Sequence, residues 1–303
     1  MSIAQNVING LIQGSLYALF AASFTIIFGV MDIPNMAHGA MFAVGAYVFY
    51  QVYEILALPW FVALACSIVV VGALGAAIER GFLDRLYGRD DSEYVFGVIL
   101  VTFGLGLIIE RFIGQFWGYD NLVIEMPLLQ DHAFLVAGVS VTLAQIVIIL
   151  FGVGSFAFLY WFSNHTLMGH SLRAIVQDRE LAYMKGIDVE RVFLYTFVLG
   201  SAMISIAGVL YGTMFTLSPD MGFNLLIKSF IIVILGGIGS IFGAGIAGFG
   251  LGMYEAFAIA YLDSYYIFAS EFLLLIAYVL LKSIVTDAET PILTKLLAYG
   301  RSQ

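Results

Sequence analysis

The sequence predicts an all-α membrane protein that crosses the bilayer about eight or nine times. Of its 303 residues, 62% are hydrophobic and only 11% are charged, whereas soluble domains contain about 25% charged residues. The mean hydropathy is +1.00. The apolar runs are long and unbroken, unlike the short alternating segments of a membrane β-barrel. This composition excludes a soluble enzyme, a disordered chain and a nucleic-acid binder.

The individual spans follow from the apolar stretches, because a helix needs about 20 apolar residues to cross the hydrocarbon core. We expect residues 1–303 to form a single transmembrane domain. The predicted spans are residues 6–29, 36–54, 58–79, 94–117, 140–163, 191–214, 224–242, 243–262 and 266–284.

Three groups of basic residues indicate the orientation of these spans, because Lys and Arg accumulate on the cytoplasmic side. Residues 118–139 contain acids but no Lys or Arg, which is typical of the opposite side. Nine spans with the N-terminus outside and the C-terminus inside satisfy all of these constraints. The basic groups are Arg80, Arg85 and Arg89; Arg173, Arg179, Lys185 and Arg191; and Lys282, Lys295 and Arg301.

A polar interruption separates the first two spans. Pro34 removes a backbone donor and biases Ile33 away from helix, while Asp32, Asn35 and His38 place polar groups near membrane depth. Such backbone is tolerated only against protein or a watery cavity. The segment is either an ordinary cytoplasmic turn or part of a gate in a transport pathway.

The loop at residues 164–190 contains the sequence SLRAIVQDRELAYMKG, which predicts a short cytoplasmic helix. Ser171 is a plausible N-cap and Gly186 a stop signal. Apolar residues recur at roughly helical spacing, with charged residues between them. This amphipathic helix either lies on the lipid surface or docks a soluble partner.

A second interruption, Gly236-Gly-Ile-Gly-Ser240, predicts a chain reversal with gate candidates at Gly236, Gly237 and Gly239. Lys228 and Glu255 then lie about 20 Å of helix from the turn on either side, at similar depth. We expect them to form an ion pair within the membrane, with charged atoms closer than about 6 Å. The alternative is two separate interfacial charges.

No pattern of residues predicts catalysis, a metal site or nucleotide binding. The four His residues are scattered, and the GxxxxGK[ST] phosphate loop is missing. Residues 243–248 match GxGxxG, but they lie between apolar helices and not in a soluble α/β unit. Close helix packing through GxxxG spacings explains these glycines better.

Several ordered segments resemble the membrane permeases of branched-chain amino acid (Liv-type) ABC importers, over residues 10–284. They are Gly14-Ser-Leu-Tyr-Ala-Leu19, Phe28-Gly-Val-Met-Asp-Ile-Pro-Asn-Met-Ala-His-Gly39, Gly45-Ala-Tyr47, Thr102-Phe-Gly-Leu-Gly-Leu107, Gly169-His-Ser-Leu-Arg-Ala174, Asp178, Ala182, Gly186-Ile187, Lys228, Gly236-Gly-Ile-Gly-Ser240, Gly243-Ala244 and Glu255.

The resemblance implies a non-enzymatic subunit of an ATP-driven importer in the inner membrane. Its partners would be a second permease subunit, forming a heterodimer, a substrate-binding protein and two cytoplasmic ATPase subunits, which would hold the ATP and Mg²⁺. This chain itself would carry no cofactor. The family's coupling helix would fall on about Ser171 to Lys185. The residues expected to contact the ATPase are Ser171, Leu172, Arg173, Ala174, Asp178, Ala182, Lys185 and Gly186.

The substrate remains open at this stage. Branched-chain or other hydrophobic amino acids lead, while similar permeases carry urea, short amides, or small aromatic and organic acids. A stand-alone channel or secondary transporter is an alternative from another class. In that case Asp32, His38, Lys228 and Glu255 would be ion or proton sites. A cytosolic docking helix argues against a channel, which has no need for one.

Overall fold

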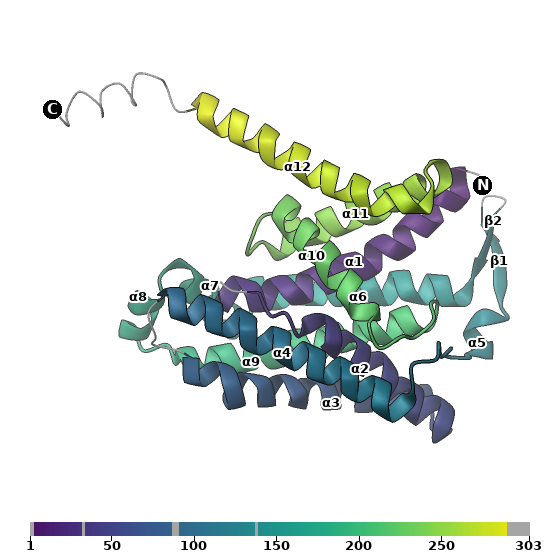
Figure 1. Cartoon of the computed structure of the whole chain (residues 1–303), viewed down its shortest axis with the longest axis horizontal. Helices are drawn as coiled ribbons and strands as arrows, with labels where there is room; N and C mark the ends of the chain where they lie inside the picture. The colour runs from purple at the N-terminus through teal and green to yellow at the C-terminus, as the bar shows by residue number, and fades with distance from the viewer. Residues whose placement is uncertain (1–2, 32–33, 87–90, 137–138, 290–303) are drawn as a thin grey trace.

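The structure is a bundle of apolar helices. It is a computed structural model that describes residues 3–31, 34–86, 91–136 and 139–289 (Figure 1). The helices are α1 (Ile3–Met31), α2 (His38–Tyr50), α3 (Trp60–Ile78), α4 (Asp91–Trp117), α5 (Pro127–Gln130), α6 (Leu143–His165), α7 (Leu167–Gln177), α8 (Arg179–Met184), α9 (Val189–Gly212), α10 (Met221–Gly236), α11 (Ile241–Tyr261) and α12 (Ser264–Glu289). Shorter elements are the π-helical turns Gln51–Ile55 and Glu79–Leu83, the 3-10 turn Asp84–Leu86, and the antiparallel strands β1 (Ala133–Val136) and β2 (Val139–Thr142).

Each predicted span coincides with a helix. Within the described residues, seven helical stretches are long and apolar enough to cross a membrane: those of α1, α3, α4, α6, α9, α11 and α12. The other two predicted spans fall on shorter helices. The second is α2 extended by the π-helical turn Gln51–Ile55, and the seventh is α10. The predicted end of the seventh span at residue 242 is wrong, because α10 already ends at Gly236.

The two ends of the bundle carry different structures. Figure 1 shows α7 and α8 at one end and the hairpin of β1 and β2 at the other. The connection between α9 and α10 lies at the hairpin end, since Leu217 forms a β-bridge with Leu122. The segments that charge patterning assigned to opposite sides of the membrane therefore lie at opposite ends of the molecule.

Helix α1 forms the centre of the bundle and packs against α6, α9, α10 and α11. Its closest neighbour is α11, and glycines allow that approach. A Cβ atom added at Gly252 would lie 2.2 Å from the backbone nitrogen of Gly14, and one at Gly248 would lie 2.6 Å from that of Ala18. The spacing of Gly248 and Gly252 therefore serves helix packing, as predicted for the GxGxxG match.

The short helices α2 and α10 approach each other through a second glycine contact. A Cβ atom at Gly222 would lie 1.8 Å from the carbonyl oxygen of Gly39. Helix α2 also packs on α3 and α9, where the Ser67 hydroxyl donates to the carbonyl oxygen of Gly45 at 2.6 Å. The buried Ser67 hydroxyl is thus bonded, as an apolar surrounding requires.

Candidate functional site

The loop at residues 164–190 forms two short helices, and the prediction of one helix capped by Ser171 is wrong. Helix α7 begins earlier, where the Thr166 hydroxyl accepts a hydrogen bond from the Gly169 backbone at 3.0 Å. The chain breaks at Asp178, whose carboxylate accepts from the backbone of Leu181 at 2.8 Å and caps α8. Gly186 follows α8 with φ +85°, so it acts as the stop that the sequence indicated.

Both helices are amphipathic in three dimensions. Leu172 and Ile175 of α7 and Ala182 of α8 are buried against the bundle. Arg173 donates hydrogen bonds to the carbonyl oxygen of Ser163 and to Oδ1 of Asn164, at 3.1 Å for the latter, and so ties α7 to the end of α6. Of the other predicted coupling residues, Asp178, Lys185 and Gly186 are exposed, while Ser171 and Ala174 are half-buried.

An apolar surface faces away from the bundle on these two helices. Leu167 is 89% exposed, Met184 73% and Tyr183 72%. Exposed apolar side chains that stand beside charged ones are typical of a surface that contacts another protein or a membrane.

A cavity of about 300 Å³ connects α7 with the predicted gate turn; we call it the α7 cavity. Its walls include Leu172 and Arg173 of α7, Gly239 and Ser240 of the turn, and Gly29 of α1. Gly29 lies directly beside the turn, since a Cβ added there would lie 3.3 Å from Cα of Gly239. The structure therefore brings the predicted coupling and gate segments to one place.

The gate turn owes its shape to its glycines. Gly237 and Gly239 have φ values of +91° and +81°, which side chains other than glycine rarely adopt. Gly236 fits against the first turn of α11, where its added Cβ would lie 2.4 Å from the carbonyl carbon of Gly243. Ser240 caps α11 by accepting from the backbone of Gly243 at 3.0 Å.

The polar interruption before α2 is packed inside the bundle. Oδ1 of Asn35 accepts a hydrogen bond from the backbone of Ala37 at 3.0 Å. The His38 ring is fully buried, with Nε2 3.1 Å from the Ser23 hydroxyl, and the rings of Phe20 and Phe24 lie edge-on to it. Asp32 lies outside the described residues. His38 thus holds the entry into α2 against α1, and Asn35 shapes the turn before it.

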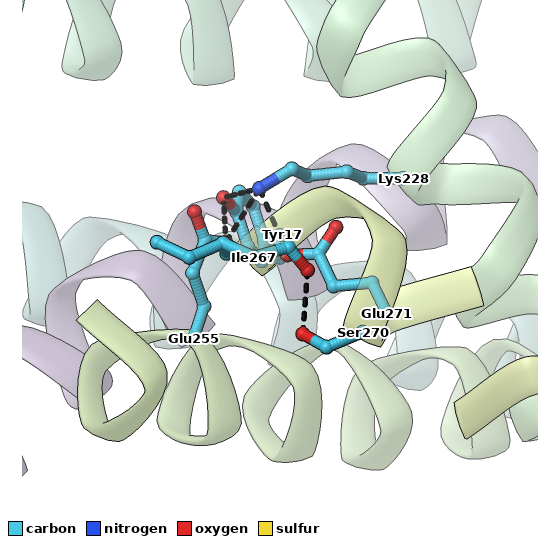
Figure 2. Close-up of polar contacts among 6 residues, drawn as sticks. All are labelled: Tyr17, Lys228, Glu255, Ile267, Ser270 and Glu271. Carbon is cyan, nitrogen blue, oxygen red and sulfur yellow. Dashed lines mark hydrogen bonds and ion pairs between the residues drawn. The ribbon is translucent and has the colours of Figure 1, made fainter. Parts of the chain in front are cut away.

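Lys228 of α10 and Glu255 of α11 lie in contact, well within the distance of about 6 Å expected for the predicted ion pair. Lys228 Nζ donates to Glu255 Oε2 at 2.6 Å, to Glu271 Oε1 at 3.1 Å and to the Tyr17 hydroxyl at 3.1 Å. The Tyr17 hydroxyl donates in turn to Glu255 Oε2 at 2.5 Å. Figure 2 shows these side chains, from α1, α10, α11 and α12, converging on the lysine nitrogen. We call these four residues the polar cluster.

Sequence reasoning missed two members of the polar cluster, Tyr17 and Glu271. Glu271 was detectable, because it is an isolated acid inside the predicted span 266–284, and intramembrane charges are rare without a partner. Tyr17 gave no such signal, since a tyrosine in an apolar helix is ordinary.

A second cavity, of about 290 Å³, opens beside the polar cluster; we call it the α9–α10 cavity. Tyr17, Lys228 and Glu255 form part of its wall, and residues between α9 and α10 form another part. The structure thus places the predicted ion pair at one cavity and the predicted gate turn at another. Within the described residues, no group of three His, Cys, Asp or Glu side chains is placed to hold a metal ion.

Comparison with known proteins identifies the family of this transmembrane bundle. Residues 6–284 match the family described as "Branched-chain amino acid transport system / permease component". The "High-affinity branched-chain amino acid transport system permease protein LivH" of Salmonella typhimurium is 31% identical over 290 residues, covering 91% of this chain and 92% of that protein. The corresponding protein BraD of Pseudomonas aeruginosa is 31% identical, covering 84% of this chain and 85% of its own.

A more distant relative is a protein of Methanocaldococcus jannaschii named "Probable branched-chain amino acid transport permease protein LivH", which is 28% identical and covers 84% of this chain. The chain is a multi-pass inner membrane protein and a transport subunit, not an enzyme. It belongs to the family of branched-chain amino acid transport system permease components.

Proposed function

We propose that this chain is one of two permease subunits, within a heterodimer, of an ATP-driven importer for branched-chain amino acids. The names of the relatives support this substrate class. In the complete importer, a substrate-binding protein delivers the amino acid on the outer side. Two cytoplasmic ATPase subunits hold ATP and Mg²⁺ and dock on α7 and α8.

The observation that carries this proposal is the α7 cavity. Coupling requires that a surface touched by the ATPases be connected mechanically to the transport pathway. Helices α7 and α8 present exposed Leu167, Tyr183 and Met184 outward. On its inner side α7 borders the same cavity as the gate turn at Gly239. A displacement of α7 would therefore act directly on that turn.

The test uses Arg173→Ala and Asp178→Ala in the importer reconstituted with its partner subunits. Arg173 anchors α7 to α6 and Asp178 caps α8, so both changes loosen the link without replacing any residue of the membrane helices. We expect ATP hydrolysis to continue while uptake of leucine falls at least about tenfold, a barrier change of about 1.4 kcal/mol.

The matched control is Arg191→Ala, which removes an exposed ion pair with Asp188 at the start of α9. It should leave uptake per ATP unchanged. Unchanged uptake in both loop variants would contradict the coupling assignment. The chain alone in liposomes should show no leucine flux, and a robust flux there would support the channel alternative. A co-purified binding protein that holds urea, an amide or an aromatic acid would contradict the proposed substrate class but leave the coupling assignment intact.

A further inference from the structure

The wall of the α9–α10 cavity carries polar side chains, and their hydrogen-bonding groups favour some ligand groups over others. The cavity lies between α1, α10, α11 and the α9–α10 connection, and at about 290 Å³ it is near the size of pockets that hold small molecules. Its polar wall residues are Gln13, Tyr17, Thr216, Ser218, Asp220, Asn224, Lys228 and Glu255.

Lys228 cannot bind an anionic ligand without giving up one of its present hydrogen bonds. A lysine ammonium group has three N–H donors. All three of those of Lys228 are used, by Tyr17, Glu255 and Glu271. The single Tyr17 O–H is also used, since it donates to Glu255. The polar cluster therefore offers no free donor to a carboxylate.

Hydrogen-bond acceptors, in contrast, remain available at the cavity. Oε1 of Gln13 is buried and has no hydrogen-bond partner among the described residues. Gln13 lies one helical turn before Tyr17, on the same face of α1. The hydrogen bonds that Tyr17 and Lys228 donate to Glu255 both use its Oε2 atom.

The formal charges of the groups around the cavity also favour a cationic ligand. One lysine faces the carboxylates of Glu255, Glu271 and Asp220. Acidic groups stay in excess even when one of these carboxyl groups holds a proton. A cationic donor with several N–H groups satisfies both the unused acceptors and the excess charge, because charge-assisted hydrogen bonds are the stronger ones.

Another part of the cavity wall is apolar. Leu16, Tyr211, Phe215, Met221 and Leu225 line it. A short branched aliphatic chain attached to the cationic group would contact these side chains and gain from the removal of its surface from water.

We propose that the α9–α10 cavity is a transient substrate site that recognises a primary ammonium group carrying a branched aliphatic chain. In the importer this group is the α-amino group of the transported amino acid, so the inference rests on the proposed function and locates its substrate. Gln13, Asp220 and Glu255 accept hydrogen bonds from the ammonium group, and Lys228 holds Glu255 in position.

The experiment places a thiol in the cavity wall of the full-length chain in lipid nanodiscs. Cys66 is the single cysteine, so Cys66→Ala with Asn224→Cys gives one thiol at the cavity. Its reaction with neutral methyl methanethiosulfonate is followed by intact-mass spectrometry. Three ligands that share the same aliphatic chain are titrated: leucine, 3-methylbutan-1-amine and 4-methylpentanoate.

We expect leucine and the amine to slow the modification about tenfold at ten times their dissociation constant, because the occupied site excludes the reagent. 4-Methylpentanoate, which lacks the amino group, should not protect. In the control Ser140→Cys, on the exposed hairpin, the thiol should react with the reagent at the same rate whichever ligand is present. Equal protection by the amine and the carboxylate, or protection by neither, would overturn the proposal.

Two further variants test the assigned acceptors. Gln13→Ala should weaken protection by the amine at least about fivefold, roughly 1 kcal/mol, by removing one acceptor. Asn9→Ala changes the same helix one turn earlier, outside the cavity wall, and should leave protection unchanged. Identical protection in both variants would contradict the role of Gln13.

The outcome can be separated from that of the proposed function. ATP-driven uptake of leucine by the assembled importer together with an unprotected thiol would remove this site and keep the function. Protection by the amine without ATP-driven uptake would support the site and contradict the proposed function.

Discussion

Replacing Lys228 with methionine tests whether the polar cluster depends on its one cation. Lys228→Met keeps an unbranched side chain of similar length but leaves Glu255 and Glu271 without their common partner. The side chain of Glu271 is 0% exposed and that of Glu255 11%, so water cannot replace the lysine at Glu271. Glu271 Oε2 already has no hydrogen-bond partner among the described residues, which makes Glu271 the carboxylate most harmed by the change.

The expected loss of unfolding free energy follows from comparing two estimates. Three hydrogen bonds to charged groups sum to about 4.5–9 kcal/mol at their usual individual values. Removal of one partner from a buried ion pair costs about 3–5 kcal/mol in measured cases, because the remaining charges rearrange or take up protons. The second estimate includes that relaxation, so we expect Lys228→Met to lower the free energy of unfolding by about 3–5 kcal/mol.

The assay is reversible unfolding of the purified chain in mixed micelles by titration with sodium dodecyl sulfate. The double variant Lys228→Met with Glu271→Gln should recover at least about 1 kcal/mol relative to Lys228→Met alone, because it removes an orphaned charge. Lys185→Met, at an exposed lysine after α8, should stay within about 0.5 kcal/mol of the wild type. A loss below about 1 kcal/mol for Lys228→Met, or no recovery in the double variant, would refute this reasoning.

Two further predictions concern packing and capping. Gly252→Ala should destabilise the fold by about 1–3 kcal/mol or more, because its methyl group would lie 2.2 Å from the backbone of Gly14. Gly250→Ala on the same helix meets no atom within 4 Å and should leave the melting temperature in detergent unchanged; equal losses in both variants would contradict the packing argument. Thr166→Ala removes the N-cap of α7 and should cost about 1 kcal/mol of local stability. Faster hydrogen exchange at the Gly169 amide would reveal that loss, and an unchanged rate would count against the cap.

The sequence predicted the spans well because the thickness of the bilayer sets their length. It also predicted the contact of Lys228 with Glu255, since a turn at residues 237–240 makes their helices antiparallel neighbours. The end of α10 was misplaced by six residues, from 236 to 242. Apolar Ile241 and Phe242 continue the hydropathy of α10, although they already belong to α11.

The loop at 164–190 shows where sequence reasoning fails for a physical reason. Apolar periodicity continues across residues 177 and 178, so the pattern favoured one helix. The structure instead uses the short side chains of Thr166 and Asp178 as caps, and a cap side chain competes locally with the helical hydrogen bonds. Tyr17 was unpredictable for another reason. It lies 211 residues from Lys228 along the chain, and no local spacing reports such a contact.

The seam between α1 and α11 has a mechanical consequence for the substrate route. Main-chain atoms of α1 lie directly opposite Gly248 and Gly252 of α11, so no side chain is present at these two positions to rotate or compress. Tyr17 and Glu255 lie on the two helices that this seam joins, and their side chains are hydrogen-bonded to each other. We expect any widening of the space beside them to come from α10, which carries Lys228 and is joined to α11 through the glycines of the gate turn. Movement of α10 would then carry Lys228 away from Tyr17 and Glu255.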